Sequence, residues 1–316
     1  MAAFPIVDCH QHFWDLGRNY HPWLCDEPLI PFRYGDYSAI RRDYLPPHYR
    51  ADAGSQPVVQ TVYVETEWDP ADPLGEVAFA AELAHRFGLP NAVVAQAWLD
   101  AVDVEAVLDA HARHPLVRGV RHKPRTTPAQ VKPTPRTPGA MDDPRWRAGF
   151  ALLAPRNLSF DLQVPAWHLA QAAELAADFG DTTIVLNHTG LPADRSPTGL
   201  GRWRRGMALL AQCPNVAVKI SGLGLPGRPW RVDDQRPVVE ATLELFGVER
   251  CMFASNFPVD RLVADFDTIF SGFKTLVADL DPAAQRRLFH DNAVATYRLD
   301  PAPTGDPGSM PRPPAA

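Results

Sequence analysis

The amino-acid sequence predicts an α/β fold, the (β/α)8 TIM barrel, and two observations lead to this prediction. Eight short runs rich in apolar and β-branched residues recur along the 316-residue chain. Segments that repeat apolar residues with the 3.6-residue period of an amphipathic helix separate most of them. Alternating strands and helices are typical of a parallel sheet covered by helices, and eight strands are the number that closes this barrel.

The predicted strands, in order along the chain, are residues 4–10, 58–65, 92–99, 117–123, 158–164, 183–188, 216–221 and 250–255. The predicted helices between and after them are residues 76–87, 104–114, 166–179, 203–212, 235–246 and 265–280. Each of these helices has one apolar face, as expected for the outer ring of a barrel. The first is rich in Ala, Glu and Leu, which have high helix propensity.

The barrel is predicted to occupy residues 1–299 as one domain, with two loop insertions at its C-terminal face. Residues 13–57 are rich in Trp and Tyr and are expected either to wall one side of a pocket or to cap the barrel. Residues 124–147 contain six prolines and are interpreted as a lid or an extended surface loop. Residues 300–316 contain six prolines among small residues, which predicts a disordered tail.

Composition and charge exclude several classes of protein. The chain is 46% hydrophobic and 22% charged, with a net charge of −6. It therefore has material for a large core and no basic excess that would attract nucleic acid or an anionic membrane. No apolar run is long enough to span a membrane and the first residues lack a signal-peptide pattern, so a cytoplasmic location is expected. The four cysteines form no C-x-x-C pair, which argues against a thiolate zinc site and a disulfide framework.

Three histidines stand where two predicted strands end, and active sites of these barrels lie at such ends. His10 and His12 project to the same face of the first strand because they are two residues apart, and His188 ends the sixth strand. Neutral imidazoles suit zinc, so the three histidines are the predicted ligands of one divalent metal ion. The alternative is three hydrogen-bonded imidazoles that bind substrate without a metal.

Basic residues gather at the same predicted mouth. Arg121, His122 and Lys123 end the fourth strand, and Lys219 lies near the end of the seventh. A group of cations in a cleft suits an anionic substrate or a developing oxyanion. For each cation alone, an internal salt bridge is an equal alternative. Trp68 is expected to stack on a flat substrate ring, with core packing as its alternative.

Six segments at the strand ends together resemble the amidohydrolase superfamily. They are DCHQHFWD at residues 8–15, YVETEW at 63–68, RGVRH at 118–122, LNHTG at 186–190, VKISGL at 218–223 and MFASNFP at 252–258. More narrowly, the chain resembles the branch that contains sugar-acid lactonases, such as L-fuconolactonase and L-rhamnonolactonase, and 2-pyrone-4,6-dicarboxylate lactonase. The resemblance spans about residues 4–299 and implies a barrel of the amidohydrolase type.

The resemblance also implies roles for individual residues. In that family the paired histidines, the histidine of strand six and an aspartate after strand eight form the site, and the aspartate activates water. The first three match His10, His12 and His188, but Asn256 stands where the aspartate is expected. An amide cannot act as a general base, so Asn256 is predicted to orient water or substrate while another group transfers the proton.

Two carboxylates are candidates for that proton transfer. Asp260 lies four residues after Asn256, and Glu65 ends the second strand. Glu65 has an equal alternative as the ion-pair partner of Arg121. The end of strand four has no lysine of the kind that bridges two metals, since Lys123 stands in a different setting, so one metal or none is expected.

These features predict a hydrolase that opens a lactone of a small, anionic sugar acid or aromatic-catabolism acid. Two alternatives stay open at this point. One is a zinc-dependent decarboxylase of a small unsaturated acid, an activity that the wider superfamily contains. The other is a barrel that binds a small acid without catalysis, because loss of the aspartate is what a decayed enzyme would show. The expected partner is a small-molecule substrate, and a homodimer is left open.

Overall fold

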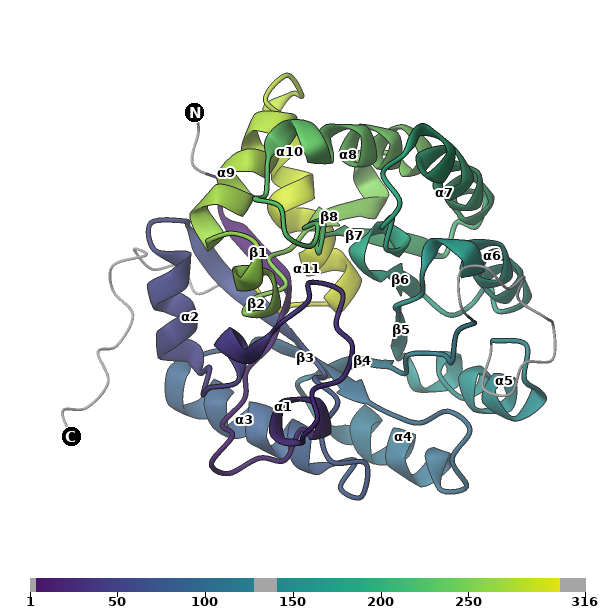
Figure 1. Cartoon of the computed structure of the whole chain (residues 1–316). Coiled ribbons are helices and arrows are strands. Elements are labelled where there is room, and N and C mark those ends of the chain that lie inside the picture. Colours follow the sequence, from purple (N-terminus) through teal and green to yellow (C-terminus); the bar gives the residue numbers. More distant parts are fainter. Residues whose placement is uncertain (1–3, 128–140, 302–316) are drawn as a thin grey trace.

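The computed structural model describes residues 4–127 and 141–301, and its eight parallel strands form one sheet in sequential order. The sheet curves into a nearly closed barrel with the helices around it (Figure 1). Two backbone hydrogen bonds join the end of the last strand to the first: Asn256 N donates to His10 O and His12 N donates to Phe257 O, both at 2.8 Å. The predicted (β/α)8 barrel is confirmed.

The strands are β1 (Ile6–Gln11), β2 (Val58–Val64), β3 (Ala92–Gln96), β4 (Val117–Arg121), β5 (Ser159–Leu162), β6 (Ile184–Leu186), β7 (Val216–Ile220) and β8 (Cys251–Phe253). Seven of them end one to three residues earlier than predicted. The reason is that the polar residues after each strand turn out of the ladder into the loops at the mouth.

The helices are α1 (Pro22–Cys25), α2 (Pro46–Ala53), α3 (Gly75–Phe87), α4 (Val104–Arg113), α5 (Pro144–Ala151), α6 (Leu169–Asp178), α7 (Pro197–Ala211), α8 (Val232–Phe246), α9 (Phe266–Leu276), α10 (Pro282–Arg286) and α11 (Asn292–Tyr297). The sequence did not predict α1 and α2, which lie in the first insertion, or α5, which begins in the second. It also did not predict α10 and α11, which follow the last predicted helix. Residues 128–140 of the second insertion and 302–316 of the predicted tail lie outside the described residues.

The barrel interior contains a cluster of apolar side chains, and α11 closes it at one end (Figure 1). Val7 of β1, Val62 of β2 and Met252 of β8 pack there against Tyr297 of α11. The chain after α11 meets the beginning of β2, where the Gln60 amide donates to the carbonyl oxygen of Asp300 at 2.8 Å. The closed end is therefore the N-terminal end of the strands, and the mouth is the opposite end.

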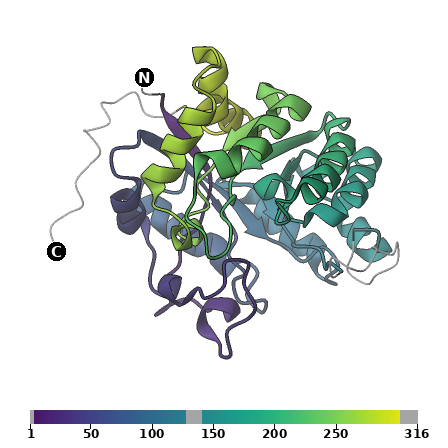
Figure 2. The same cartoon turned by 45° about the horizontal axis from the view of Figure 1, so that its top comes forward.

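The first insertion covers the mouth. In Figure 1 the segment around α1 crosses in front of the strands, and in Figure 2 it projects below the barrel, so it lies beyond the C-terminal strand ends. Within residues 4–127 and 141–301, no helix combines the length and the apolar character needed to cross a membrane.

Gly149 seats α5 against the loop that follows β3. A Cβ atom at Gly149 would lie 1.9 Å from the carbonyl oxygen of Leu99, a backbone atom that cannot move aside cheaply. We expect Gly149→Ala to lower the free energy of unfolding by about 1–3 kcal/mol, as overpacking does. Gly180→Ala, where nothing lies within 4 Å, is the matched control and should change it by less than about 0.5 kcal/mol. Urea denaturation measures both, and equal effects would contradict this packing.

Candidate active site

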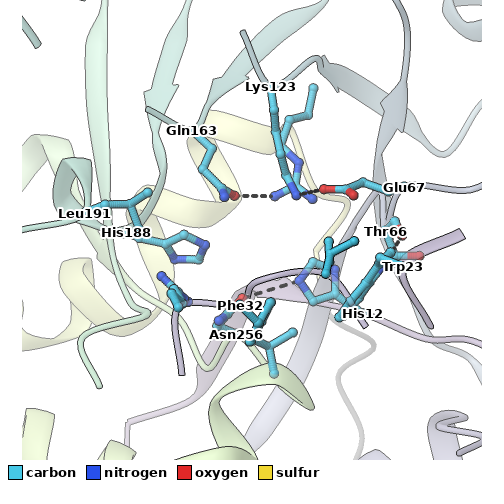
Figure 3. Close-up of a pocket in the computed structure, with 14 residues that line it drawn as sticks. His12, Trp23, Phe32, Thr66, Glu67, Lys123, Gln163, His188, Leu191 and Asn256 are labelled. Atoms are coloured by element: carbon cyan, nitrogen blue, oxygen red, sulfur yellow. Dashed lines mark hydrogen bonds and ion pairs between the residues drawn. The ribbon is translucent and has the colours of Figure 1, made fainter. Parts of the chain in front are cut away.

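A cavity of about 290 Å³ opens at the mouth of the barrel. Its walls come from the first insertion and from the ends of β1, β2, β4, β5, β6 and β8 (Figure 3). The lining residues are His12, Trp23, Ile30, Phe32, Arg33, Thr66, Glu67, Arg121, Lys123, Gln163, His188, Leu191, Asn256 and Val259. The structure thus brings five predicted site residues to one cavity, namely His12, Arg121, Lys123, His188 and Asn256.

The first insertion forms one wall of this cavity. Trp23 stacks on Phe32 with ring centroids 5.7 Å apart, and its indole N–H donates to the carbonyl oxygen of Thr66 at 2.8 Å. The Tyr37 hydroxyl donates to the carbonyl oxygen of Trp23 at 2.9 Å. Residues 13–57 therefore wall one side of the pocket, which is the first of the two roles expected for them.

Three histidines meet at the centre of the mouth. The ring centroids of His10 and His12 are 5.0 Å apart, and those of His10 and His188 are 4.6 Å apart. Burial lowers the pKa of His12 to about 3 and holds the pKa values of His10 and His188 well below the ordinary 6.5. All three rings are consequently neutral near pH 7.

His12 and Asn256 present two hydrogen-bond acceptors to each other. Nδ1 of His12 donates to the carbonyl oxygen of Val64 at 2.8 Å, which leaves a lone pair on Nε2. This Nε2 lies 3.4 Å from Oδ1 of Asn256. The amide orientation is fixed because its Nδ2 donates to Oδ1 of Asp260 at 2.6 Å. A donor such as a water molecule is needed to satisfy both acceptors.

Asp260 is buried behind Asn256 and is not part of the cavity wall. Its Oδ1 also accepts hydrogen bonds from the Tyr34 hydroxyl at 3.0 Å and from the Arg33 guanidinium at 3.5 Å. Burial raises the pKa of this carboxyl, an effect that the Arg33 charge only partly offsets. This placement does not match the predicted role of Asp260 in proton transfer, and it makes Asp260 a positioning residue for the amide.

Glu65 is the buried counter-ion of Arg121. The guanidinium donates to Oε1 of Glu65, and Nη1 of Arg121 donates to the Gln163 amide oxygen at 3.2 Å. Oε2 of Glu65 accepts from the backbone N–H of Glu67 at 2.7 Å. Burial raises the pKa of Glu65, but the Arg121 charge brings it below its ordinary value. Both carboxylate oxygens of Glu65 are engaged. The structure therefore shows Glu65 as the ion-pair partner of Arg121, which was the alternative to a role in proton transfer.

Two predicted substrate-binding residues, His122 and Trp68, line a second cavity instead of the first. It shares Glu67, Arg121 and Lys123 with the first cavity. Lys123 forms an ion pair with Glu67 at this shared wall (Figure 3), and both side chains are partly exposed.

Lys219 does not reach the mouth, which corrects its predicted role in substrate binding. It is fully buried in the barrel, where Nζ donates to the Asp161 carboxylate at 2.5 Å. Asp161 also accepts hydrogen bonds from the Tyr297 hydroxyl at 2.9 Å and from the Asn187 amide at 2.8 Å. Lys219 therefore takes the salt-bridge alternative, one layer below the cavity.

The predicted three-histidine metal site is not present as a formed ligand set and stays a prediction. Among the described residues, no three His, Cys, Asp or Glu side chains are placed to hold one ion. His12 and His188 each engage Nδ1, with Val64 O and with Ser221 Oγ, which leaves Nε2 of each ring as the atom that could face an ion. The fourth expected ligand is replaced by the amide of Asn256. His10 differs from these two histidines, because both of its buried ring nitrogens are without a partner in the described part of the chain.

The backbone is strained at the mouth. Five of the seven non-glycine residues with positive φ in the described chain lie just after β2, β6 and β8: Glu67, His188, Thr189, Leu191 and Asn256. A non-glycine residue in this region costs about 1–3 kcal/mol, and such residues concentrate at functional sites. At His188 and Asn256 this conformation turns the side chain from the strand end into the cavity (Figure 3).

The chain matches the amidohydrolase family over residues 7–299. It belongs to this family. The protein is therefore a hydrolase. It is 41% identical over 299 residues to an uncharacterised protein of Sinorhizobium fredii, covering 95% of this chain and all of that one. It is 30% identical to the L-fucono-1,5-lactonase of Burkholderia multivorans, covering 93% and 96% of the two chains.

A crystal structure of a B. multivorans amidohydrolase with bound zinc has the same fold. Its TM-score is 0.78 at 30% identity, and the match covers 93% of this chain and 99% of that chain. The resemblance recognised in the strand-end motifs is thereby confirmed at the level of the family.

Sequence reasoning did not assign a role to several residues of this amidohydrolase site. Arg33 and Tyr34 lie in the first insertion, which has no periodic pattern to place them. Thr66 and Glu67 follow Glu65 directly. They are also polar residues at the end of a strand, the position from which Glu65 was selected. Gln163 directly follows β5, and its position at a strand end could have indicated a place in the site.

The buried pair of Lys219 and Asp161 makes a prediction about stability. Lys219→Met should lower the free energy of unfolding by about 3–5 kcal/mol, because Asp161 would keep a buried charge without a cation. Arg18→Ala, which breaks the exposed pair with Glu82, is the control and should change it by less than about 1 kcal/mol. Thermal and urea unfolding give both values. A Lys219→Met variant with unchanged stability and lost substrate affinity would instead support the substrate-binding role of Lys219.

Proposed function

We propose that this amidohydrolase opens uncharged lactones of small sugar-type acids by adding water to the lactone carbonyl. The observation that supports this most directly is the facing pair of acceptors, His12 Nε2 and Asn256 Oδ1, on one side of a cavity that has Lys123 on the other (Figure 3). Arg121 also lines this cavity. A water molecule donating to both acceptors would be oriented toward a carbonyl group whose oxygen points to the cations. The lactonase of B. multivorans supports the substrate class.

The proposed step transfers one proton. The water oxygen bonds to the carbonyl carbon, a water proton passes to His12 Nε2, and the C=O electron pair moves onto the carbonyl oxygen. Arg121 and Lys123 stabilise this oxyanion. When the intermediate collapses, the bond from the carbonyl carbon to the ring oxygen breaks and that oxygen takes the proton from His12, which gives the open hydroxy acid. Asn256 orients the water throughout.

His12 rather than Glu65 or Asp260 is the proposed base, because its Nε2 keeps a lone pair and its side chain lines the cavity. Its pKa of about 3 reflects first its burial and then the charge of Arg121. Negative charge that develops on the carbonyl oxygen offsets the Arg121 charge, so the basicity of His12 rises during the attack.

Substitution of His12 tests the proposed function. We expect His12→Asn to lower kcat/KM at least ~100-fold on a panel of 1,4- and 1,5-lactones of sugar acids, the effect of losing a general base. His85→Asn, at an exposed position on α3, should leave kcat/KM within about twofold. A wild-type protein that hydrolyses none of these lactones, or an active His12→Asn variant, would contradict the proposal.

The same assays distinguish the alternative functions. They are run on chelator-treated and on zinc-supplemented protein, and activity that depends on added zinc would assign His10, His12 and His188 as ligands after all. Release of carbon dioxide from unsaturated acids would indicate a decarboxylase. Binding of small acids without turnover of any compound would indicate a non-catalytic barrel.

The low pKa of His12 predicts an unusual pH profile. A base must be neutral, so activity is lost as the pH falls through the pKa of about 3. We therefore expect kcat/KM, after subtraction of spontaneous hydrolysis, to change less than about twofold between pH 5 and pH 7.5. A base with an ordinary imidazole pKa of about 6.5 would lose roughly 30-fold by pH 5, and that result would contradict the assignment.

A further inference from the structure

A second cavity of about 330 Å³ lies beside the first, at the ends of β3 and β4. The two cavities have in common Glu67, Arg121 and Lys123, so the ion pair of Lys123 with Glu67 stands between them. The side chains of this pair are 36% and 41% exposed. Pairs with this much exposure contribute about 1 kcal/mol or less, so a ligand could part them easily.

Three aromatic rings, those of Trp68, Trp98 and His122, line the second cavity. Trp98 is 41% exposed although it is the largest type of apolar side chain, and Trp68 lines the cavity from the end of β2. The Trp98 ring meets the His122 ring edge to face, with centroids 4.9 Å apart. The exposed Trp98 indole provides contact area for a flat ligand at a small entropic cost, since an indole has only two side-chain torsions.

Two polar groups in this cavity have unused hydrogen-bonding capacity. Nδ1 of His122 accepts from Leu99 N and from the Trp146 indole N–H, both at 3.0 Å, so the ring proton is on Nε2. This Nε2–H has no partner within residues 4–127 and 141–301. Oε1 of Gln96 is buried and also without a partner there. The cavity thus presents the His122 Nε2–H as a donor, while the unpartnered Gln96 Oε1 is buried in the wall.

The charges at the shared wall are balanced. Arg121 is paired with Glu65 and Lys123 with Glu67, while burial lowers the pKa of His122 and keeps it neutral. A ligand of the second cavity therefore meets aromatic surface and neutral hydrogen-bonding groups instead of a net charge. An uncharged ring that carries hydroxyl groups satisfies all of these features.

We propose that the second cavity is a subsite for a hydroxylated, pyranose-type ring, and that the preferred lactone of this enzyme carries such a ring as a substituent. The lactone ring occupies the first cavity and the second ring lies against Trp98 and Trp68, with a hydroxyl group that accepts from His122 Nε2–H. The proposal rests on the proposed lactone hydrolysis for the first cavity, and it adds the size and class of the substrate.

The experiment compares 1,5-lactones of disaccharide aldonic acids, with a glucosyl or galactosyl second ring, to the 1,5-lactone of gluconic acid. Wild-type kcat/KM should be at least ~10-fold higher for a two-ring lactone, a difference of about 1.4 kcal/mol. Trp98→Ala should remove this preference and leave the one-ring value within about twofold. Trp167→Ala is the control, because Trp167 is 39% exposed, close to the 41% of Trp98, and lies outside the second cavity. It should change kcat/KM for neither the one-ring nor the two-ring lactone.

A binding measurement separates failure of this proposal from failure of lactone hydrolysis. Calorimetry with the open disaccharide aldonic acids should show binding to the wild type that Trp98→Ala weakens at least ~10-fold, even if no lactone is hydrolysed. Equal loss for one-ring and two-ring lactones in Trp98→Ala would overturn the subsite. So would a wild type that neither prefers two-ring lactones nor binds the disaccharide acids.

Discussion

The site depends on the seam where β8 closes against β1, and the buried Asp8 carboxylate reinforces the two backbone hydrogen bonds that join it. Asp8 accepts hydrogen bonds from Ser255 N at 2.8 Å, from Ser255 Oγ at 2.5 Å and from the Tyr49 hydroxyl at 2.7 Å. A fully buried carboxylate is stable only when it is satisfied in this way. Ser255 immediately precedes Asn256, so these bonds fix where the chain leaves β8 and set the Asn256 amide beside His12.

Charge balance then decides what the mouth can bind. Three of the four cations that the sequence places near the strand ends have buried or neighbouring carboxylate partners: Arg121 with Glu65, Lys123 with Glu67 and Lys219 with Asp161. The buried histidines are neutral. The cavity therefore offers hydrogen-bond donors with little net charge, which suits an uncharged lactone better than the carboxylated one that a group of free cations would favour.

The sequence predicts those features of the fold and site that a local pattern determines. An apolar run followed by a polar side chain marks a strand end, and this rule placed His12, His188 and Asn256 correctly at the mouth. Lys219 has the same local pattern, yet it lies one layer deeper because its partner Asp161 is on another strand. Tyr34 contacts Asp260 across 226 positions, and no local pattern contains such a contact.

The arrangement around Asn256 explains how an amide can occupy this position. A carboxylate there would lie 2.6 Å from that of Asp260, the present distance from Asn256 Nδ2 to Asp260 Oδ1, and two carboxylates so close cannot both ionise. The amide instead donates to Asp260 and turns its oxygen toward the cavity. Tyr34 and Arg33 of the first insertion hydrogen-bond the same carboxylate. One buried group therefore holds both the cavity wall and the Asn256 amide, so any movement of that wall would also release the amide.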